Sequence, residues 1–366
     1  MVKVIKENFS KYKRIYAISD LHGFLDLFNQ FYDNLNLKAD EALVIVGDII
    51  EKGEQSLGLV RRLMELCEVQ DNLYILRGNN DTLLKEFVDD EYSDEEVLGY
   101  LTRYKNMQSI LIDIAKENHI DYTSLEGIKS LKKIITSNYQ KEMNFLDSFP
   151  HILDCERAIF VHAGIKPNIE LEKQEEGFVL EAKAFASMGY HFEKPVVVGH
   201  WPSSNYSDSK IIVNSYYDRK SNIVSIDGGV GIKGWYQINV LIFDENGIAF
   251  DAYDDLPEEI ALEDQKEKQD AVTLIFPKTE VQILERGERI SKCYVPYLQK
   301  IMEFDNTSLY QYKGAEYCED FTNVELSVFS GEIISKCIGL NMEKLYKKNG
   351  IVGYYKGKTD YREVLG

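Results

Sequence analysis

Short apolar segments, each running into a polar loop, recur through the first half of this 366-residue chain. Three of them occur near its start, separated by segments with apolar residues at helical spacing. The apolar segments are 14–20, 41–48 and 73–81, and the helical segments are 25–35 and 56–68. This alternation predicts a parallel sheet covered by helices. In open sheets of this kind, sites form from polar residues at the carboxyl ends of the strands.

The pattern changes between residues 82 and 149, where it becomes helical and irregular and rich in Lys, Glu, Asn and Tyr. We interpret residues 82–149 as an inserted helical cap. Strand patterns then return at 158–164, 195–200, 223–229 and 238–254, the last with a hairpin turn at 245–247. Together these elements predict one α/β domain over residues 1–255.

A charged stretch follows at residues 256–270, with one Pro and no Gly, and we predict a linker there. A chain of 366 residues is longer than one compact core usually spans. We therefore expect further folded structure beyond the linker.

An internal repeat marks the region after residue 270. The segment Gly287–Cys293 (GERISKC) recurs 44 residues later as Gly331–Cys337 (GEIISKC), with six of the seven residues identical. This predicts two copies of one small β unit. The ending KKNGIVGYYKGK resembles the last strands of bacterial SH3-like domains. The resemblance implies tandem SH3-like barrels at 271–320 and 321–366, and the alternative is a single β extension packed on the first domain.

Charge and cysteine content narrow the classes of partner. The 61 acidic residues outnumber the 42 basic ones, for a net charge of -19, and such a surface repels nucleic acid and anionic membranes. The five cysteines are odd in number and form no CxxC pair, which favours a reducing compartment. No apolar stretch of about 18 residues and no secretory signal core occurs. We therefore expect a soluble cytoplasmic protein.

Five short motifs contain residues of metal-binding type, and four of them directly follow a predicted apolar strand. In chain order they are Asp20-x-His22, Gly47-Asp48, Gly78-Asn79-Asn80-Asp81, His162-Ala163-Gly164 and Gly199-His200. Each motif alone is more typical of a turn, loop or cap. Together they offer the carboxylate, imidazole and amide ligands of two divalent cations, with one carboxylate bridging ions about 3.5–4 Å apart. We interpret the remaining histidines, His119, His151 and His191, as surface or loop residues.

The series SDLHG, GDIIEKG, RGNND, VHAGI and VGHWP resembles the phosphoprotein phosphatase branch of the calcineurin-like metallophosphatase superfamily. Within this branch it is most similar to the symmetrical diadenosine tetraphosphatases and related bacterial protein phosphatases. The resemblance covers about residues 14–230 and leaves the C-terminal third of the chain outside. It implies a four-layer α/β/β/α sandwich for a catalytic domain at 1–255.

The resemblance also implies ligands for two divalent metal ions, either manganese, iron or zinc, with manganese expected in vitro. Asp20 and His22 would bind the first ion, and Asp48 would bridge both. The ligands that complete the second ion would be Asn79, His162 and His200. Pro202 replaces a further histidine of the wider superfamily, which is typical of the phosphoprotein phosphatase branch. Arg77 matches an arginine that contacts phosphate, and its forked donors suit phosphoryl oxygens.

The chain departs from the family pattern beside the bridging carboxylate. The family's general acid, a histidine after the metal-binding Asn, is Asn80 here, and an amide cannot release a proton to a leaving group. The family's Asp-Arg-Gly is Glu51-Lys52-Gly53, so the carboxylate that supports the histidine and the planar fork of the arginine are both lost. Asp81 is a candidate substitute acid, with orientation of its loop as the alternative. Losing a general acid costs about 10²–10⁴-fold in rate, and it matters less for good leaving groups.

These features predict a two-metal phosphoester hydrolase in which a hydroxide bridging the metals attacks in line. Arg77 and Lys52 would stabilise the transition-state charge. The Asp227-Gly228-Gly229 turn either supports the site from outside or is a plain turn. The expected substrates are phosphomonoesters or phosphoanhydrides of the nucleotide type with good leaving groups.

Two alternatives stay open at this point. One is a protein serine/threonine phosphatase, which shares the fold and the metals and differs in substrate. The other is a weakly active, metal-bound sensor or scaffold that binds a protein or peptide through the C-terminal β repeats. The complete ligand set favours retained activity, with a small phosphorylated molecule or a phosphoprotein as the partner.

Overall fold

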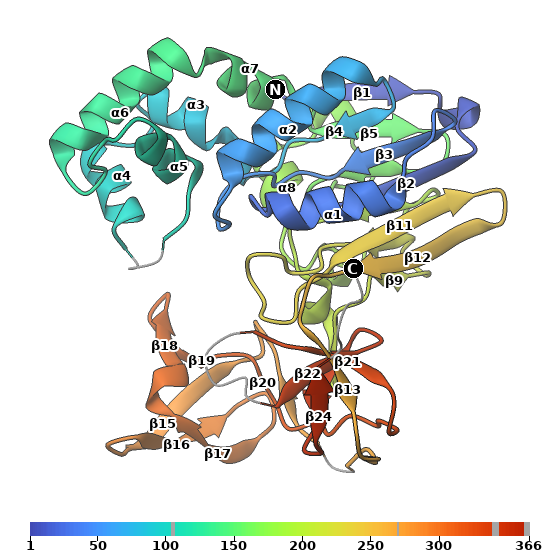
Figure 1. Ribbon diagram of the computed structural model, residues 1–366, viewed down its shortest axis with the longest axis vertical. Helices are drawn as coiled ribbons and strands as arrows, with labels where there is room; N and C mark the ends of the chain where they lie inside the picture. The colour runs from blue at the N-terminus through green and yellow to red at the C-terminus, as the bar shows by residue number, and fades with distance from the viewer. Residues whose placement is uncertain (104–106, 269–270, 339–343, 362–366) are drawn as a thin grey trace. The chain divides into compact units, whose positions relative to one another are not determined.

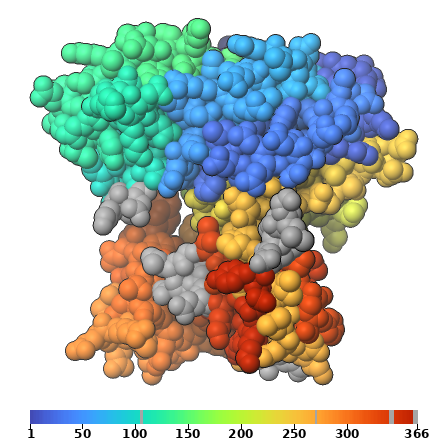
Figure 2. Space-filling view, viewed as in Figure 1, coloured from blue at the N-terminus to red at the C-terminus, as the bar shows by residue number. Residues whose placement is uncertain are grey.

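The computed structural model describes residues 1–103, 107–268, 271–338 and 344–361. Contacts within the chain group it into two compact units, which Figures 1 and 2 show as a ribbon and as filled atoms. The first unit consists of Met1–Pro202 and Ser215–Asp255, and the second of Ser203–Asn214 and Leu256–Gly366.

A five-stranded sheet forms one half of the first unit. Its order is β12 (Gly247–Tyr253), β11 (Ile238–Asp244), β2 (Arg14–Ile18), β3 (Glu41–Ile45) and β4 (Leu73–Ile75). The strands β2, β3 and β4 run parallel, and β11 joins β2 antiparallel. The connecting helices α1 (Leu25–Leu35) and α2 (Ser56–Val69) lie over one face of this sheet (Figure 1). The predicted parallel strands covered by helices are therefore present.

A six-stranded sheet forms the other half of the first unit. Its order is β1 (Val4–Glu7), β5 (Ile152–Cys155), β6 (Ile159–Val161), β7 (Val196–Val198), β10 (Ile223–Ser225) and β9 (Tyr216–Asp218). The strands β6, β7 and β10 run parallel. Apolar side chains of both sheets share one fully buried core, which includes Ala17, Val44, Phe160, Val197 and Leu241. Two sheets packed face to face, with helices outside, agree with the predicted α/β sandwich.

Helices occupy most of the described chain between β4 and β5. They are α3 (Leu83–Val88), α4 (Asp94–Leu101), α5 (Ile110–Glu117), α6 (Leu125–Asn138) and α7 (Gln140–Ser148). Ser93, Ser109 and Ser124 begin three of these helices, since each hydroxyl accepts a backbone N–H of the first turn. Figure 1 shows the group at one side of the unit. The helical character predicted for residues 82–149 is thus observed. A further short helix, α8 (Glu176–Glu181), follows β6.

The second unit is built from antiparallel strands. A six-stranded sheet has the order β24 (Thr359–Tyr361), β13 (Glu258–Ala261), β21 (Ile333–Lys336), β22 (Leu345–Lys348), β23 (Ile351–Tyr354) and β8 (Ile211–Ile212). A five-stranded sheet has the order β17 (Lys300–Asp305), β16 (Ile290–Val295), β15 (Glu280–Arg286), β19 (Ala315–Cys318) and β18 (Leu309–Tyr312). A two-stranded ladder joins β14 (Thr273–Leu274) to β20 (Phe321–Thr322). The expected all-β C-terminal region is confirmed.

The stretch predicted as a linker contains a strand. β13 lies within residues 256–270 and pairs with both β21 and β24. The charged composition of the segment suggests an exposed linker, but Glu259 in β13 is only 4% exposed. Its carboxylate accepts a hydrogen bond from Tyr346 Oη at 2.8 Å. Lys336 Nζ lies 3.5 Å from the same carboxylate. A paired, hydrogen-bonded carboxylate therefore lets a charged segment form an internal strand.

The segment Ser203–Asn214 also differs from expectation, since the sequence places it inside the first domain. Ile211 and Ile212 form β8 and pair with Val352 and Ile351 of β23. The segment consequently belongs to the second unit. Such pairing joins parts of the chain that are far apart in sequence, so no local pattern predicts it.

The two copies of the repeat form a turn and a strand in separate sheets. Gly287 precedes β16, and Gly331 precedes β21. Cys293 and Cys337, which end the two copies, are both buried. Each sheet has its own apolar cluster, and the division into two small β units stays a prediction. The SH3-like identity of these units stays a prediction.

All five cysteines are free thiols. Within the described ranges, the search for a helix both long and apolar enough to cross a membrane finds none. The cytoplasmic location stays a prediction.

Candidate metal centre

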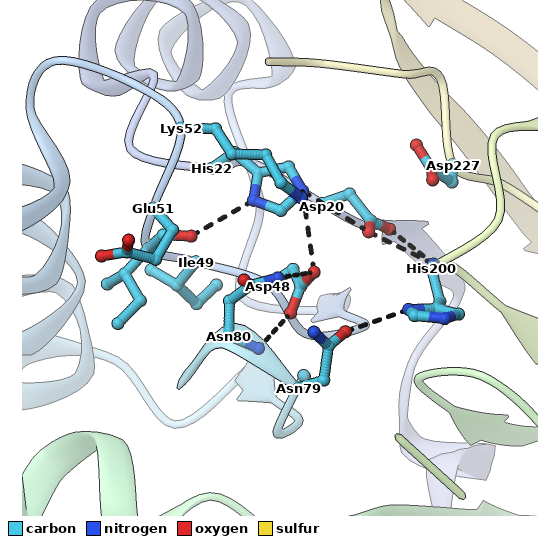
Figure 3. Close-up of polar contacts among 12 residues, drawn as sticks. Asp20, His22, Asp48, Ile49, Glu51, Lys52, Asn79, Asn80, His200 and Asp227 are labelled. Atoms are coloured by element: carbon cyan, nitrogen blue, oxygen red, sulfur yellow. Dashed lines mark hydrogen bonds and ion pairs between the residues drawn. The ribbon is translucent and has the colours of Figure 1, made fainter. Parts of the chain in front are cut away.

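The predicted ligands lie in loops that follow parallel strands of both sheets. Asp20 and His22 follow β2, Asp48 follows β3, Asn79 follows β4, His162 follows β6 and His200 follows β7. Figure 3 shows the side chains of Asp20, His22, Asp48, Asn79 and His200 pointing toward one another. The carboxyl ends of parallel strands meet at one edge of a sheet, so residues distant in sequence converge there.

The backbone of the centre adopts conformations that residues other than glycine rarely take. Asp20, His22, Asp48 and His200 have φ angles between 46° and 63°, in the left-handed region. Strained positions of this kind cluster at functional sites. Gly78 has a different use, because a Cβ on it would lie 2.2 Å from Asp48 Oδ1. The absence of a side chain at residue 78 therefore lets two ligand loops approach each other closely.

One group of donor atoms, here called the second site, consists of Asp48, Asn79, His162 and His200. Asn79 Oδ1 lies 3.2 Å from His162 Nε2 and 3.0 Å from His200 Nδ1. His162 Nε2 lies 3.5 Å from Asp48 Oδ1. Neighbouring ligands of one divalent ion are about 3 Å apart when each bond is about 2.1 Å long. The spacing therefore fits a single ion.

The other group, here called the first site, consists of Asp20, His22 and the same Asp48. One ligand atom from each of these residues lies within 4.8 Å of the others. His22 Nε2 is 3.6 Å from Asp48 Oδ2 and 4.0 Å from Asp20 Oδ1. The two oxygens of Asp48 thus face different sites, since Oδ1 lies toward His162 and Oδ2 toward His22. This arrangement suits a carboxylate that bridges two ions.

The histidine rings present unprotonated nitrogens to the two sites. His22 Nδ1 lies 3.2 Å from Ile50 O, and His162 Nδ1 lies 2.9 Å from Val46 O. An N–H that donates to a backbone carbonyl places the free electron pair on Nε2, where a metal binds. Burial, followed by the charge of Lys52, lowers the pKa of His22 to about 3. The His22 ring is therefore a neutral ligand at pH 7.

Three buried carboxylates surround the first site. Burial and the charge of Asp48 hold the pKa of Asp20 well above its usual range. Burial acts to raise the pKa of Asp48 as well, but nearby His162, His22 and Lys52 outweigh it and lower that pKa. The structure adds Asp227, which follows β10, is 0% exposed and has a pKa raised by burial and by Asp20.

Asp227 is the residue that the sequence left undecided between a plain turn and a supporting role. Its Oδ1 accepts the N–H of Gly229 at 2.7 Å, as in an ordinary turn. Its Oδ2 is buried and has no hydrogen-bond partner in the described chain. The position of Asp227 after a third parallel strand of its sheet, matching the other ligand loops, is the signal that favours the site.

The donor set fits divalent metals. It combines carboxylates, imidazoles and one amide oxygen, and such mixed ligands suit manganese, iron and zinc. Two groups that share one carboxylate would hold two ions.

Residues 13–222, more than half of the chain, match the family model of calcineurin-like phosphoesterases. The chain belongs to the calcineurin-like phosphoesterase family. It is a hydrolase of phosphate esters, and the enzymes of this family use divalent metals. The predicted superfamily, fold class and enzyme class are thereby confirmed.

Several solved structures are similar to this phosphoesterase. A structure provisionally named a diadenosine tetraphosphatase is 19% identical, with 70% of this chain and 100% of that chain covered and a TM-score of 0.47. A protein serine/threonine phosphatase from Saccharomyces cerevisiae is 11% identical, with 69% and 83% covered and a TM-score of 0.39. A metallophosphoesterase from Sphaerobacter thermophilus is 15% identical, with 66% and 89% covered and a TM-score of 0.38. No curated protein sequence matches significantly.

Asn80 and Asp81 both hydrogen-bond to Asp48, Asn80 to its carboxylate and Asp81 to its backbone N–H. The backbone N–H of Asn80 donates to Asp48 Oδ1 at 3.0 Å, and its amide Nδ2 donates to Asp48 Oδ2 at 2.6 Å. Asp81 accepts backbone N–H groups of Asp48, Ile49 and Gly78 at 2.8 to 3.0 Å. Burial and the charge of Asp48 raise the pKa of Asp81 to about 6. Since its oxygens face backbone donors, the geometry favours loop orientation for Asp81 over proton donation.

Arg77 is engaged away from the ligands. Its Nη2 donates to Asp147 Oδ1 at 2.8 Å and to Asp147 O at 2.5 Å. Its backbone N–H donates to Pro150 O at 2.9 Å. These bonds tie the end of β4 to the end of α7. The buried Nε of Arg77 has no hydrogen-bond partner in the described part of the chain, and the phosphate contact of Arg77 stays a prediction.

Glu51 connects the centre to the inserted helices. Its carboxylate is 2% exposed and accepts hydrogen bonds from Tyr100 Oη at 2.5 Å, Ser109 Oγ at 2.8 Å and Ile110 N at 2.9 Å. Burial raises the pKa of Glu51, although these three donors and Lys52 act against it. A buried carboxylate at the N-terminus of α5 is favoured by the free N–H groups there. The sequence showed only that this position departs from the family's Asp.

Replacing this carboxylate is expected to destabilise the fold. In Glu51→Gln the amide oxygen can still accept from Ser109 Oγ and Ile110 N, but the NH₂ group faces Tyr100 Oη, whose hydroxyl must turn from donor to acceptor. The hydrogen bonds to a charged group are lost, at a cost of about 1–3 kcal/mol. We expect lower thermal and urea midpoints than for the wild type. The matched control is Glu54→Gln, three residues away and exposed. Equal midpoints for both variants would contradict the role of Glu51.

Proposed function

We propose that this phosphoesterase is a two-metal hydrolase of phosphomonoesters or phosphoanhydrides of the nucleotide type, with good leaving groups. The observation that carries the proposal is the Asp48–Asn80 pair. Asp48 stands between two ligand groups, and the residue bonded to it carries an amide where the resembling family carries an acid. Manganese is the ion that we propose for assays, with iron and zinc as alternatives.

Some residues of the site would hold the metal ions, and others would place charge beside them. Bound divalent ions would supply an acidified water and polarise phosphoryl oxygens. Asp48 would keep the two sites in register, because its two oxygens face different ligand groups. Lys52, in the place of the family's arginine, carries a positive charge beside the first site.

The leaving group decides the substrate class. Asn80 cannot release a proton, and Asp81 is occupied by backbone donors. The leaving groups of phosphoanhydrides and aryl phosphates are stable anions, so they need little protonation. Alkyl phosphates such as phosphoserine depend on a proton donor, and its loss costs them about 10²–10⁴-fold. The site therefore favours nucleotide-type and other activated substrates.

A manganese-supplemented assay over four substrates tests this proposal. We expect turnover of p-nitrophenyl phosphate and a dinucleoside polyphosphate, with much slower turnover of a phosphoserine peptide and of bis-p-nitrophenyl phosphate. Equal rates on the peptide and the dinucleoside polyphosphate would favour a protein serine/threonine phosphatase. Metal binding without turnover of any substrate would favour a sensor or scaffold. In that case the two β units of the C-terminal region become the proposed binding surface for a protein or peptide.

A further inference from the structure

Lys52 contacts the atom of His22 that would bind the first metal. Its Nζ lies 2.8 Å from His22 Nε2 and donates a hydrogen bond to it (Figure 3). We propose that Lys52 is a built-in competitor of the first metal, so that the ammonium and the ion occupy the first site alternately. The inference rests on the proposed two-metal function and adds an order of loading to it.

The two occupants exclude each other because His22 offers one electron pair. Its Nδ1 hydrogen donates to Ile50 O, and only Nε2 remains as an acceptor. A metal would lie about 2.0–2.1 Å from Nε2 along the axis of that electron pair. The Lys52 ammonium at 2.8 Å uses the same pair, so it must leave before the ion can bind.

Charge explains why an ammonium rests there. Asp20, Asp48 and Asp227 are each no more than 2% exposed. The positive charge of Lys52 acts to lower the pKa of all three carboxyl groups. Asp227 Oδ2 has no hydrogen-bond partner within the described ranges. Buried carboxylates close to one another are costly without a neighbouring cation. Lys52 supplies one positive charge when no ion is bound, and a divalent ion would supply two.

The loop that carries Lys52 is held in place. Glu51 and Lys52 have φ angles of 73° and 69°, a strained pair for two consecutive side-chain-bearing residues. The bonds from Tyr100 and the Ser109 region hold Glu51, as described above. Gly231 packs closely against both residues, because a Cβ on it would lie 3.2 Å from Lys52 Cβ and 3.3 Å from His22 Cβ. The ammonium is thus aimed at His22 by the course of the backbone.

The competitor can leave without a change of fold. Lys52 is exposed as a residue, whereas His22 is 0% exposed. A flexible lysine stem can rotate its ammonium into water. The second site differs, since its His162 and His200 nitrogens face Asn79 Oδ1. We infer that the second site loads first and tightly, that the first site loads weakly, and that Lys52 becomes available to phosphate only when both are filled.

Calorimetric titration of manganese into the chelator-treated full chain tests the inference, together with elemental analysis of bound metal. Lys52→Met keeps the length of the stem and removes the charge. We expect it to tighten the weaker binding event at least about tenfold and to leave the tighter one unchanged. Removing the counter-charge should also lower the melting temperature of the metal-free protein and enlarge its rise on adding manganese.

Two controls separate competition from a general charge effect. Lys52→Arg keeps a cation and should keep the weak event weak. Lys183→Met removes an exposed charge that acts on His200 from a distance, and it should change neither event. The inference would also be supported if the wild type showed one manganese-binding event in the titration and Lys52→Met showed two. Two events unchanged in Lys52→Met would overturn it and leave the two-metal proposal standing. No manganese bound by any variant would overturn both.

Discussion

Asp48→Asn is expected to lower kcat/KM on p-nitrophenyl phosphate by at least about 10³-fold. Asp48 is the residue shared by both candidate sites, with Oδ1 3.5 Å from His162 Nε2 and Oδ2 3.6 Å from His22 Nε2. An amide has one acceptor oxygen and no charge, so it cannot hold two cations at once. Its NH₂ group would also face the Nδ2 donor of Asn80. Both ion spacing and ion affinity are therefore lost.

The measurement pairs steady-state kinetics in excess manganese with elemental analysis of the bound metal. Asp33→Asn, an exposed carboxylate on α1, is the matched control and should leave both unchanged. Circular dichroism of the variant excludes unfolding as the cause. If Asp48→Asn keeps full activity, the two-metal mechanism is wrong.

Asn80→His is expected to raise the rate on a phosphoserine peptide by about 10- to 10²-fold and to change the rate on p-nitrophenyl phosphate little. A histidine at residue 80 restores a group that can protonate an alkoxide leaving group. The gain should stay below the full effect of a general acid, about 10²–10⁴-fold, because Glu51 is not free to orient the ring. Glu51, at the place of the family's supporting Asp, is bonded instead to Tyr100, Ser109 and Ile110.

Kinetics on a series of phosphates with leaving groups of rising pKa would check this result. The wild type should show a steep fall in rate along the series, and Asn80→His a shallower one. Asn80→Gln is the control, since it keeps an amide and should keep the steep fall. A wild type that shows no fall would remove the argument for activated substrates.

Most of the candidate ligand set was predictable from the sequence because four of the five motifs directly follow a predicted apolar strand. Strand ends of a parallel sheet meet at one edge, so the order of Asp20, Asp48 and Asn79 already placed them together. Asp227 follows a strand in the same way, but its Asp-Gly-Gly sequence is equally typical of a turn. Its place after a third parallel strand of its sheet, its burial, and an Oδ2 with no hydrogen-bond partner among the described residues favour the site.

The roles of the residues around the ligands were less predictable. The sequence offered Arg77 as a phosphate contact, which stays a prediction, but it gave no sign of the hydrogen bond between Arg77 and Asp147. Residues 256–270 have the composition of a linker, yet Glu259 is buried in β13. In both cases the partner lies far along the chain, and a local pattern carries no information about it.

The sequence by itself determined the enzyme family, the metal-binding residue types and the loss of the general acid at Asn80. The residue types are read from the ends of the predicted strands, and the family and the departure at Asn80 follow from the resemblance of the five motifs to the family pattern. The tertiary structure alone decided which groups the side chains of Glu51, Lys52 and Arg77 contact. It also decided which strands complete the C-terminal sheets. The physical reason is that these contacts join distant segments, and their geometry depends on the course of the loops between them.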